Sequence, residues 1–243
     1  MKSPIIVVGI GEIGSVIARG FLCTGHSVYP VTRDMDIQKV AKTVAKPEAV
    51  VIAVGESELD SVLSRVPLEW KTKIILIQNE LLPRDWKKHD LSPSVISVWF
   101  EKKKGQDVKV VVPSPIYGEK SKILSEALNS LDIPTVLIDN EDQITFELVR
   151  KNYYILTSNI AGLKVGGSVG ELWKKHKEFA VSVIQDVHTI QECLVGDTLD
   201  KEALTDAMLI AFDGDPNHDC KGRSAPARLS RALETADLES LNT

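Results

Sequence analysis

The sequence has little cysteine, few aromatic residues and no long hydrophobic run. Its 3 cysteines are too few and too scattered for a disulfide framework or a closed zinc site. The first apolar run, residues 4–8, is broken off by Gly9 and Gly11 and is too short for a secretion signal or a membrane span. Lysine and arginine number 29 against 34 acidic residues, so the chain lacks the basic footprint of nucleic-acid-binding proteins. We therefore expect a cytoplasmic protein with no membrane or nucleic-acid partner.

The remaining composition is that of an ordinary globular protein, and 243 residues suffice for one or two domains. Up to about residue 140, short aliphatic runs alternate with helical segments. The runs include 5–8, 28–31, 50–54, 74–77, 95–98, 108–112 and 135–138. This alternation predicts an α/β domain with a doubly wound parallel sheet covered by helices on both faces.

The pattern changes near residues 139–143. From 144 to 192 the periodicity is helical throughout, and 199–212 and 225–238 predict two further helices. We therefore predict two domains, 1–140 with the sheet and 141–243 as a smaller all-helical domain.

A glycine motif directly follows the first strand and opens the first helix. It reads Gly9-Ile10-Gly11-Glu12-Ile13-Gly14. In this context Gly9 permits a tight turn, Gly11 lets the backbone approach a pyrophosphate, and Gly14 allows close packing of helix and strand. The helix N-terminus then offers amide groups and a positive dipole to the phosphates. The motif predicts that the first domain is a dinucleotide-binding Rossmann domain.

The choice between the two nicotinamide nucleotides depends on the end of the second strand. Thr32 and Arg33 stand there and favour NADP, because a guanidinium and a hydroxyl suit a 2′-phosphate. Asp34 follows directly. If the register at the strand end were shifted by one residue, Asp34 would take the place of Arg33, and its carboxylate would favour the ribose hydroxyls of NAD. NADP is the expected cofactor, with NAD as the open alternative.

At this point the sequence resembles the ketopantoate reductase (2-dehydropantoate 2-reductase) family over most of its length. Residues 9–14 match the family's nucleotide motif, and Arg33 falls where the family places an arginine that binds the 2′-phosphate. Asn79 follows a strand as the family's nicotinamide-contacting asparagine does. The most specific match is Lys151, with Asn159 eight residues later and the Gly-Glu-Leu turn at 170–172.

The resemblance implies hydride transfer between NADPH and the carbonyl of a small, 2-oxo-acid-like substrate. Lys151 would donate the proton to the developing alkoxide, and Asn159 and Asn79 would place the substrate. The expected partners are thus a small-molecule substrate and, as the candidate protein partner, a second copy of the chain. No metal is expected, because the acidic loop at 213–220 matches no metal-binding spacing.

Several family positions are changed. Ile155 replaces the first helix asparagine, and Gln78 and Glu80 flank Asn79 in place of histidine and glycine. The family's substrate-binding serine falls near Gly214-Asp215, and its catalytic-site glutamate near Ala225-Pro226. These changes leave two alternatives open: a catalytically inactive NADP-binding sensor or scaffold of the same fold, and a dehydrogenase of another family with a helical second domain.

Overall fold

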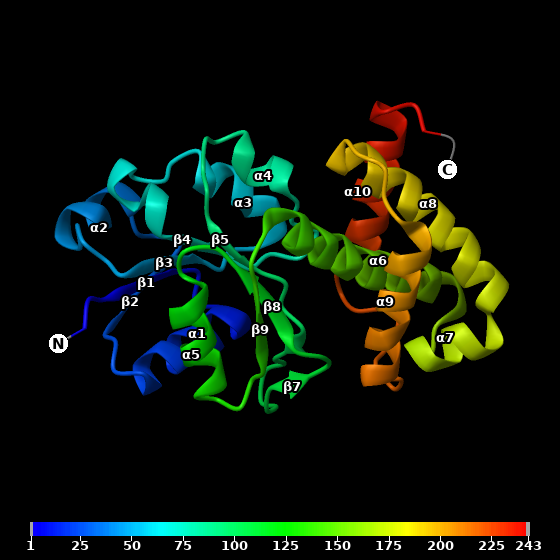
Figure 1. Ribbon diagram of the computed structural model, residues 1–243, viewed down its shortest axis with the longest axis horizontal. Helices are drawn as coiled ribbons and strands as arrows, with labels where there is room; N and C mark the ends of the chain where they lie inside the picture. The colour runs from blue at the N-terminus through cyan, green and yellow to red at the C-terminus, as the bar shows by residue number, and fades with distance from the viewer. Residues whose placement is uncertain (1, 242–243) are drawn as a thin grey trace. The chain divides into compact units, whose positions relative to one another are not determined.

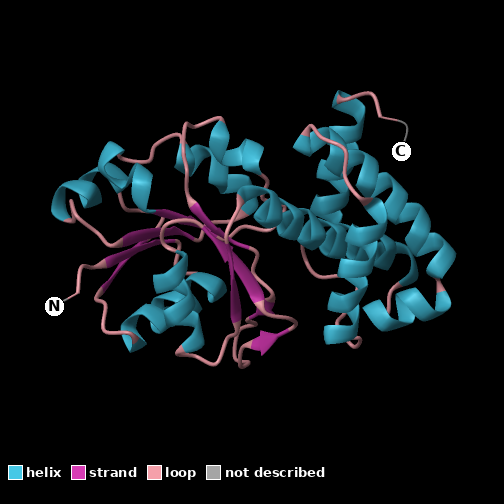
Figure 2. Cartoon of the chain, in the orientation of Figure 1, coloured by secondary structure: helices cyan, strands magenta, loops and turns pink. Residues whose placement is uncertain are grey.

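The structure is a computed structural model that describes residues 2–241. It divides into two compact units, residues 1–147 and 148–243. In the described chain, all strands belong to unit 1, and unit 2 consists of helices and loops (Figures 1 and 2). The prediction of a doubly wound α/β domain followed by a smaller helical domain is confirmed.

Unit 1 is built on a seven-stranded sheet with the order β2-β1-β3-β4-β5-β8-β9. Its strands are β1 (Ile5–Val8), β2 (Val28–Val31), β3 (Ala49–Ile52), β4 (Ile74–Leu76), β5 (Ser94–Ile96), β8 (Ser114–Tyr117) and β9 (Thr135–Ile138). From β1 the chain moves first outward to β2 and then back across to β3, so Ile5 pairs with both Val28 and Ala49. The order therefore reverses between β1 and β3, which is the usual ligand-binding crevice of a doubly wound sheet.

Helices cover both faces of the sheet. On one face lie α1 (Glu12–Cys23) and α5 (Ser121–Asn129), and on the other α2 (Ile37–Thr43), α3 (Glu56–Leu63) and α4 (Pro83–Lys87) (Figure 1). Both alternating sets of β1 residues, Ile5 with Val7 and Ile6 with Val8, are buried, as a sheet covered on two sides requires. A Cβ at Gly20 would lie 2.4 Å from the Ala127 carbonyl oxygen, so this glycine allows α1 and α5 to touch.

The structure departs from the sequence prediction around residues 100–117. The strand expected at 108–112 is only the short β7 (Lys109–Val110), which forms an antiparallel hairpin with β6 (Phe100–Glu101). The central sheet instead uses β8, whose Ser-Pro-Ile-Tyr sequence lacks the aliphatic pattern of a strand. Strand β8 runs antiparallel to β5 and parallel to β9, so the sheet is mostly but not wholly parallel. A short 3-10 helix (Leu68–Lys73) precedes β4.

Unit 2 is formed by α6 (Glu141–Val165), which begins in unit 1, α7 (Val169–Lys175), α8 (Lys177–Val195), α9 (Lys201–Gly214) and α10 (Ala225–Leu238). The buried Asn152 Nδ2 donates to Gln191 Oε1 at 2.8 Å. Tyr153 Oη lies 2.5 Å from His188 Nδ1, and His188 Nε2 lies 3.3 Å from a Glu192 oxygen. These pairs join α6 to α8 and satisfy polar groups that would be costly to bury alone. Within residues 2–241, no helix is long and apolar enough to cross a membrane.

Candidate functional site

The glycine motif forms a tight turn between β1 and α1. Gly9 has φ +92°, and a Cβ there would lie 2.7 Å from the Ala53 carbonyl oxygen. A Cβ at Gly14 would lie 2.2 Å from the Gly9 carbonyl oxygen and 3.1 Å from the Ala53 Cβ. Both positions thus require glycine, the first for its conformation and its contact, the second for contact alone. Ile13, the residue before Gly14, packs against the hydrophobic core of unit 1.

The turn leaves open space in front of the helix. Apart from its chain neighbours, no described atom lies within 4 Å of a Cβ placed at Gly11, the residue that caps α1. No side chain in the described chain caps this helix N-terminus, so its first amide groups remain available to an anion. Because the turn follows β1 at the point where the strand order reverses, the geometry fits a dinucleotide pyrophosphate.

Two charged residues flank this turn. Glu12 lies in the first turn of α1, and Lys102 Nζ, from the β6–β7 hairpin, lies 3.8 Å from its carboxylate. Ile10 is partly exposed at the tip of the turn. Lys102 thus offsets a negative charge beside the candidate phosphate site. The sequence alone does not indicate this contact, because residues 12 and 102 are distant in sequence.

Thr32 and Arg33 lie beyond the carboxyl end of β2, and both are exposed. The Arg33 side chain is 85% exposed, and its Nη2 lies 3.0 Å from one Glu58 carboxylate oxygen and 3.2 Å from the other. Glu58 belongs to the first turn of α3. The ion pair holds the Arg33 guanidinium close to the end of β2. Because the pair is exposed, it contributes little to the stability of the fold.

Asn79 lies beyond the carboxyl end of β4, as expected. Its Nδ2 donates to Glu56 Oε1 at 3.3 Å, which links it to the start of α3. Its neighbour Gln78 is buried, and its Nε2 donates to the carbonyl oxygens of Ile52 at 2.7 Å and Val54 at 3.2 Å. Gln78 therefore ties the ends of β3 and β4 together and positions Asn79. The sequence does not indicate that Gln78 joins two strand ends, because a glutamine after an aliphatic run belongs to no known motif.

In unit 2, Lys151 and Asn159 lie on α6. The Lys151 ammonium stands 5.8 Å from the centroid of the Tyr154 ring, within cation–π range. The Tyr154 ring also approaches the rings of Phe212 and His218, at 5.3 and 6.0 Å between centroids. Ile155, the residue in place of a family asparagine, is buried.

Asn159 is buried, and its amide is held on both sides. Its Nδ2 donates to the Cys220 carbonyl oxygen at 3.0 Å and to Ser158 Oγ at 3.3 Å. Its Oδ1 accepts from Arg228 Nη1 at 2.6 Å. Sequence reasoning did not identify Arg228, which is 69 residues away on α10 and belongs to no motif.

The loop between α9 and α10 is fastened to the end of α6 and the start of α7. Cys220 N donates to the Gly167 carbonyl, Val169 N to that of His218, and Gly170 N to that of Pro216, at 2.9 to 3.0 Å. The Gly-Glu-Leu turn belongs to this clamp, because a Cβ at Gly170 would lie 2.8 Å from the Pro216 oxygen. Burial raises the pKa of the Cys220 thiol to about 11, with Asp219 and Glu171 adding to the effect. The described residues contain no group of three or more potential ligands that could hold a metal.

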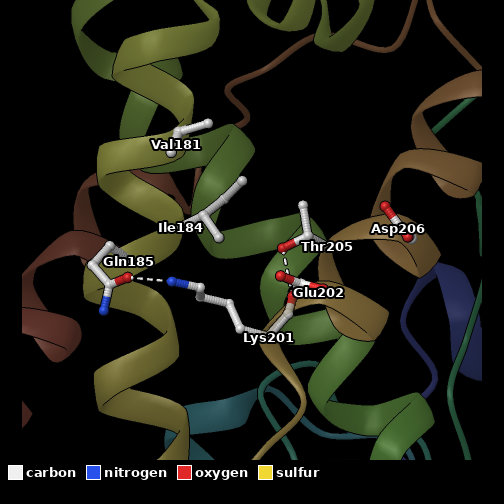
Figure 3. A pocket seen from close by; sticks show the side chains of 7 residues that line it. All are labelled: Val181, Ile184, Gln185, Lys201, Glu202, Thr205 and Asp206. Carbon is white, nitrogen blue, oxygen red and sulfur yellow. Dashed lines mark hydrogen bonds between the residues drawn. The ribbon is translucent and has the colours of Figure 1, made fainter.

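A separate pocket of about 330 Å³ lies between α8 and α9 (Figure 3). Ile184 and Val181 form its apolar side, and Lys201 Nζ donates across it to Gln185 Oε1 at 2.7 Å. The remaining lining residues are Glu202, Thr205 and Asp206. The pocket contains none of the site residues predicted from the sequence.

Comparisons with known proteins identify the fold. No protein-family model matches the sequence, and no curated protein is significantly similar to it. Among solved structures, a probable 2-dehydropantoate 2-reductase from Bacillus subtilis superposes with a TM-score of 0.64 at 18% identity, covering 98% of this chain and 94% of that one. A dimeric ketopantoate reductase from Staphylococcus aureus gives 0.63 at 16% identity, covering 99% and 93%.

A second kind of enzyme shares the same fold. The ternary structure of a D-mandelate dehydrogenase with NADH and anilino(oxo)acetate gives a TM-score of 0.64 at 12% identity, covering 98% of this chain and 93% of that one. The resemblance to ketopantoate reductases that the sequence motifs indicate is thus confirmed at the level of the fold. At these identities the comparisons show the fold alone, so the cofactor and substrate have to be inferred from the residues of this chain.

Proposed function

We propose that the chain is an NADP-dependent oxidoreductase that transfers hydride between NADPH and the carbonyl of a small 2-oxo acid. The observation that carries the proposal is the glycine turn at the start of α1. Gly9 and Gly14 are sterically required there, Gly11 faces open space, and the helix N-terminus has no side-chain cap among the described residues. This arrangement suits a pyrophosphate at the reversal point of the sheet.

Arg33 supports NADP over NAD. Its exposed guanidinium stands beyond β2 and can take the 2′-phosphate while Glu58 holds its other edge. Thr32 would add a hydroxyl. We expect Arg33→Ala to weaken NADPH binding at least about tenfold and NADH binding much less, because only NADPH carries the phosphate. Titration of NADPH and NADH fluorescence measures both, and equal losses would contradict the NADP assignment.

Lys151 is the proposed proton donor. When bound, the nicotinamide would supply the hydride, and the Lys151 ammonium would protonate the oxygen on which negative charge develops. Asn79 would place the substrate. Asn159 would act only through its neighbours, because Ser158, Cys220 and Arg228 already occupy its amide. The resemblance to two fold neighbours that act on carbonyl or hydroxyl groups supports this chemistry.

Substitution of Lys151 tests the mechanism. Lys151→Ala should lower kcat by about 100-fold or more, because general acid catalysis contributes at least that much. NADPH affinity should change little. Lys164→Ala is the matched control, since Lys164 lies on the same helix over the Phe179 ring. The assay follows NADPH absorbance with a panel of 2-oxo acids, and full activity of Lys151→Ala would rule out this role.

A second candidate is an NADP-binding sensor or scaffold without turnover. The buried state of Asn159 favours it, because both sides of its amide are engaged by protein groups. This alternative predicts NADPH binding by the wild-type protein without oxidation by any member of the panel. Turnover of a single 2-oxo acid that depends on Lys151 would exclude it.

A further inference from the structure

A hairpin outside the glycine motif brings a lysine to the start of α1. The β6–β7 hairpin is anchored at its base, where Phe100 is buried in the core of unit 1 and Val108 and Val110 pack against that core. Its tip carries Lys102, whose Nζ lies 3.8 Å from Oε2 of Glu12 in the first turn of α1. The hairpin therefore places a positive charge beside the helix N-terminus that offers its amide groups to a phosphate.

The hydrogen bonds of Lys102 hold its ammonium group in place. Lys102 Nζ donates to the carbonyl oxygen of Lys103, at 3.0 Å, and to that of Gln106. The Lys103 carbonyl also accepts from Gln106 N, which closes the turn at the hairpin tip. The Lys102 side chain is only 23% exposed, against 56% for that of Lys103. Because the backbone of the hairpin already fixes the ammonium, it has little conformational freedom to lose when it binds a ligand.

The ammonium of Lys102 has one N–H donor left for a ligand. An ammonium carries three donors, and two of them reach the hairpin carbonyls. Within residues 2–241, the third meets only the Glu12 carboxylate, at an ion-pair separation of 3.8 Å that is too long for a hydrogen bond. Next to Glu12, a Cβ placed at Gly11 would meet open space. A phosphate in this space can therefore accept from Lys102 as well as from the helix amides.

We propose that Lys102 binds the pyrophosphate of the nucleotide directly, in competition with Glu12. The inference rests on the proposed function and adds a residue to its cofactor site. A lysine binds phosphate as a point charge, so the ammonium can exchange one carboxylate for the two phosphate groups while it keeps its hairpin carbonyls. Glu12 opposes nucleotide binding, because its carboxylate repels the phosphates and pairs with Lys102. NADPH and NADH both carry the pyrophosphate, so Lys102 serves them equally, whereas Arg33 distinguishes them.

The first test measures the affinity of the full-length protein for NADPH and NADH by titration of nucleotide fluorescence. Lys102→Met, which keeps an apolar stem, and Lys102→Gln both remove the charge. Each should weaken the binding of both nucleotides by the same factor, at least about tenfold, and Lys102→Arg should restore part of the loss. Lys104→Ala, at the exposed tip of the same hairpin, is the matched control and should stay within about twofold of the wild type. Thermal unfolding reports whether each variant has folded.

The second test separates a direct contact from simple neutralisation of Glu12. Glu12→Gln should tighten the binding of both nucleotides about two- to fivefold, because the competing carboxylate is removed. Lys102→Met is then made in the Glu12→Gln protein, which completes a double-mutant cycle. If Lys102 contacts the phosphates, its loss weakens binding in this background by at least as large a factor as in the wild type. A lysine that only neutralised Glu12 would have no effect once the carboxylate is gone.

Three results would overturn the proposal: unchanged affinities of the neutral Lys102 variants, a loss confined to NADPH, or a loss that disappears in the Glu12→Gln background. Failure of the proposed function gives a different result. If the binding of both nucleotides depends on Lys102 but no 2-oxo acid is reduced, the phosphate contact stands and the reductase assignment falls. If NADPH reduces a 2-oxo acid and Lys102→Met binds both nucleotides as the wild type does, the reductase stands and the phosphate contact falls.

Discussion

At the scale of single residues, Cys220 shows how burial controls reactivity. Its side chain is buried in the clamped loop, and desolvation raises its thiol pKa to about 11, with the carboxylates of Asp219 and Glu171 acting in the same direction. The thiolate is the nucleophilic form of cysteine. At pH 8 only about one Cys220 side chain in a thousand is therefore ionised.

We predict that iodoacetamide alkylates Cys220 at least about 100-fold more slowly than Cys23 at pH 8, because Cys23 is exposed and Cys220 is both buried and protonated. Below its pKa, the thiolate fraction of Cys220 rises about tenfold for each pH unit, so its rate should climb from pH 8 to 10. Peptide mass spectrometry resolves the two sites. Similar rates at pH 8 would show that the loop opens readily.

Some site residues could be predicted from the sequence because their roles are local. Gly9, Gly11 and Gly14 serve a turn made within six residues, so their spacing alone indicates it. Arg228 and Gln78 could not be predicted in this way. Arg228 on α10 meets Asn159 on α6 only when the two helices have packed, and Gln78 bonds to carbonyl groups at the end of a neighbouring strand. Contacts of this kind depend on tertiary structure and leave no short-range pattern.

At the scale of elements, unit 2 depends on glycines where the α9–α10 loop crosses α6. Gly162 lies within α6, where alanine would normally be favoured by helix propensity. A Cβ at this position would, however, lie 2.6 Å from Cys220 Cβ and 3.0 Å from the Cys220 carbonyl carbon. Neither atom belongs to the end of a flexible side chain, so the loop itself would have to move.

We predict that Gly162→Ala lowers the free energy of unfolding by about 1–3 kcal/mol, the usual cost of overpacking a close contact. Gly222→Ala is the matched control, because no described atom outside its chain neighbours lies within 4 Å of a Cβ there, and its stability should change by less than about 1 kcal/mol. Urea unfolding followed by circular dichroism measures both variants. Equal stability of the two would mean that the loop yields at no cost.

The elements that the sequence predicts well are those with a strong apolar pattern. Strands β1, β3 and β4 are aliphatic runs buried on both faces, and the matching sequence segments are unambiguous. Strand β8 was missed, because a serine and a proline begin it, although the proline carbonyl still accepts a hydrogen bond from Ser97 N at 3.0 Å. Its place in the sheet comes from neighbours β5 and β9 rather than from its own propensity.

At the scale of the whole molecule, two compact units share one continuous helix. The predicted change of character at residues 139–143 coincides with the start of α6, and the division between the units lies a few residues inside this helix, at 147/148. Each unit has its own buried residues, an aliphatic sheet core in the first and helix-packing residues such as Leu172 and Met208 in the second. Units with separate cores are expected to unfold in separate steps.

We therefore predict two thermal transitions. NADPH at 100 times its Kd should stabilise unit 1 by about 2.7 kcal/mol and so raise the Tm of its transition by about 5–10 °C. Tryptophan fluorescence assigns the transitions, because Trp70, Trp86 and Trp99 are buried in unit 1 and Trp173 lies in unit 2. In a Trp173→Phe variant the fluorescence change reports unit 1 alone, while calorimetry records both steps. A single transition would contradict independent unfolding of the two units. If NADPH shifted only the step that this variant's fluorescence does not follow, a nucleotide site on unit 1 would be contradicted.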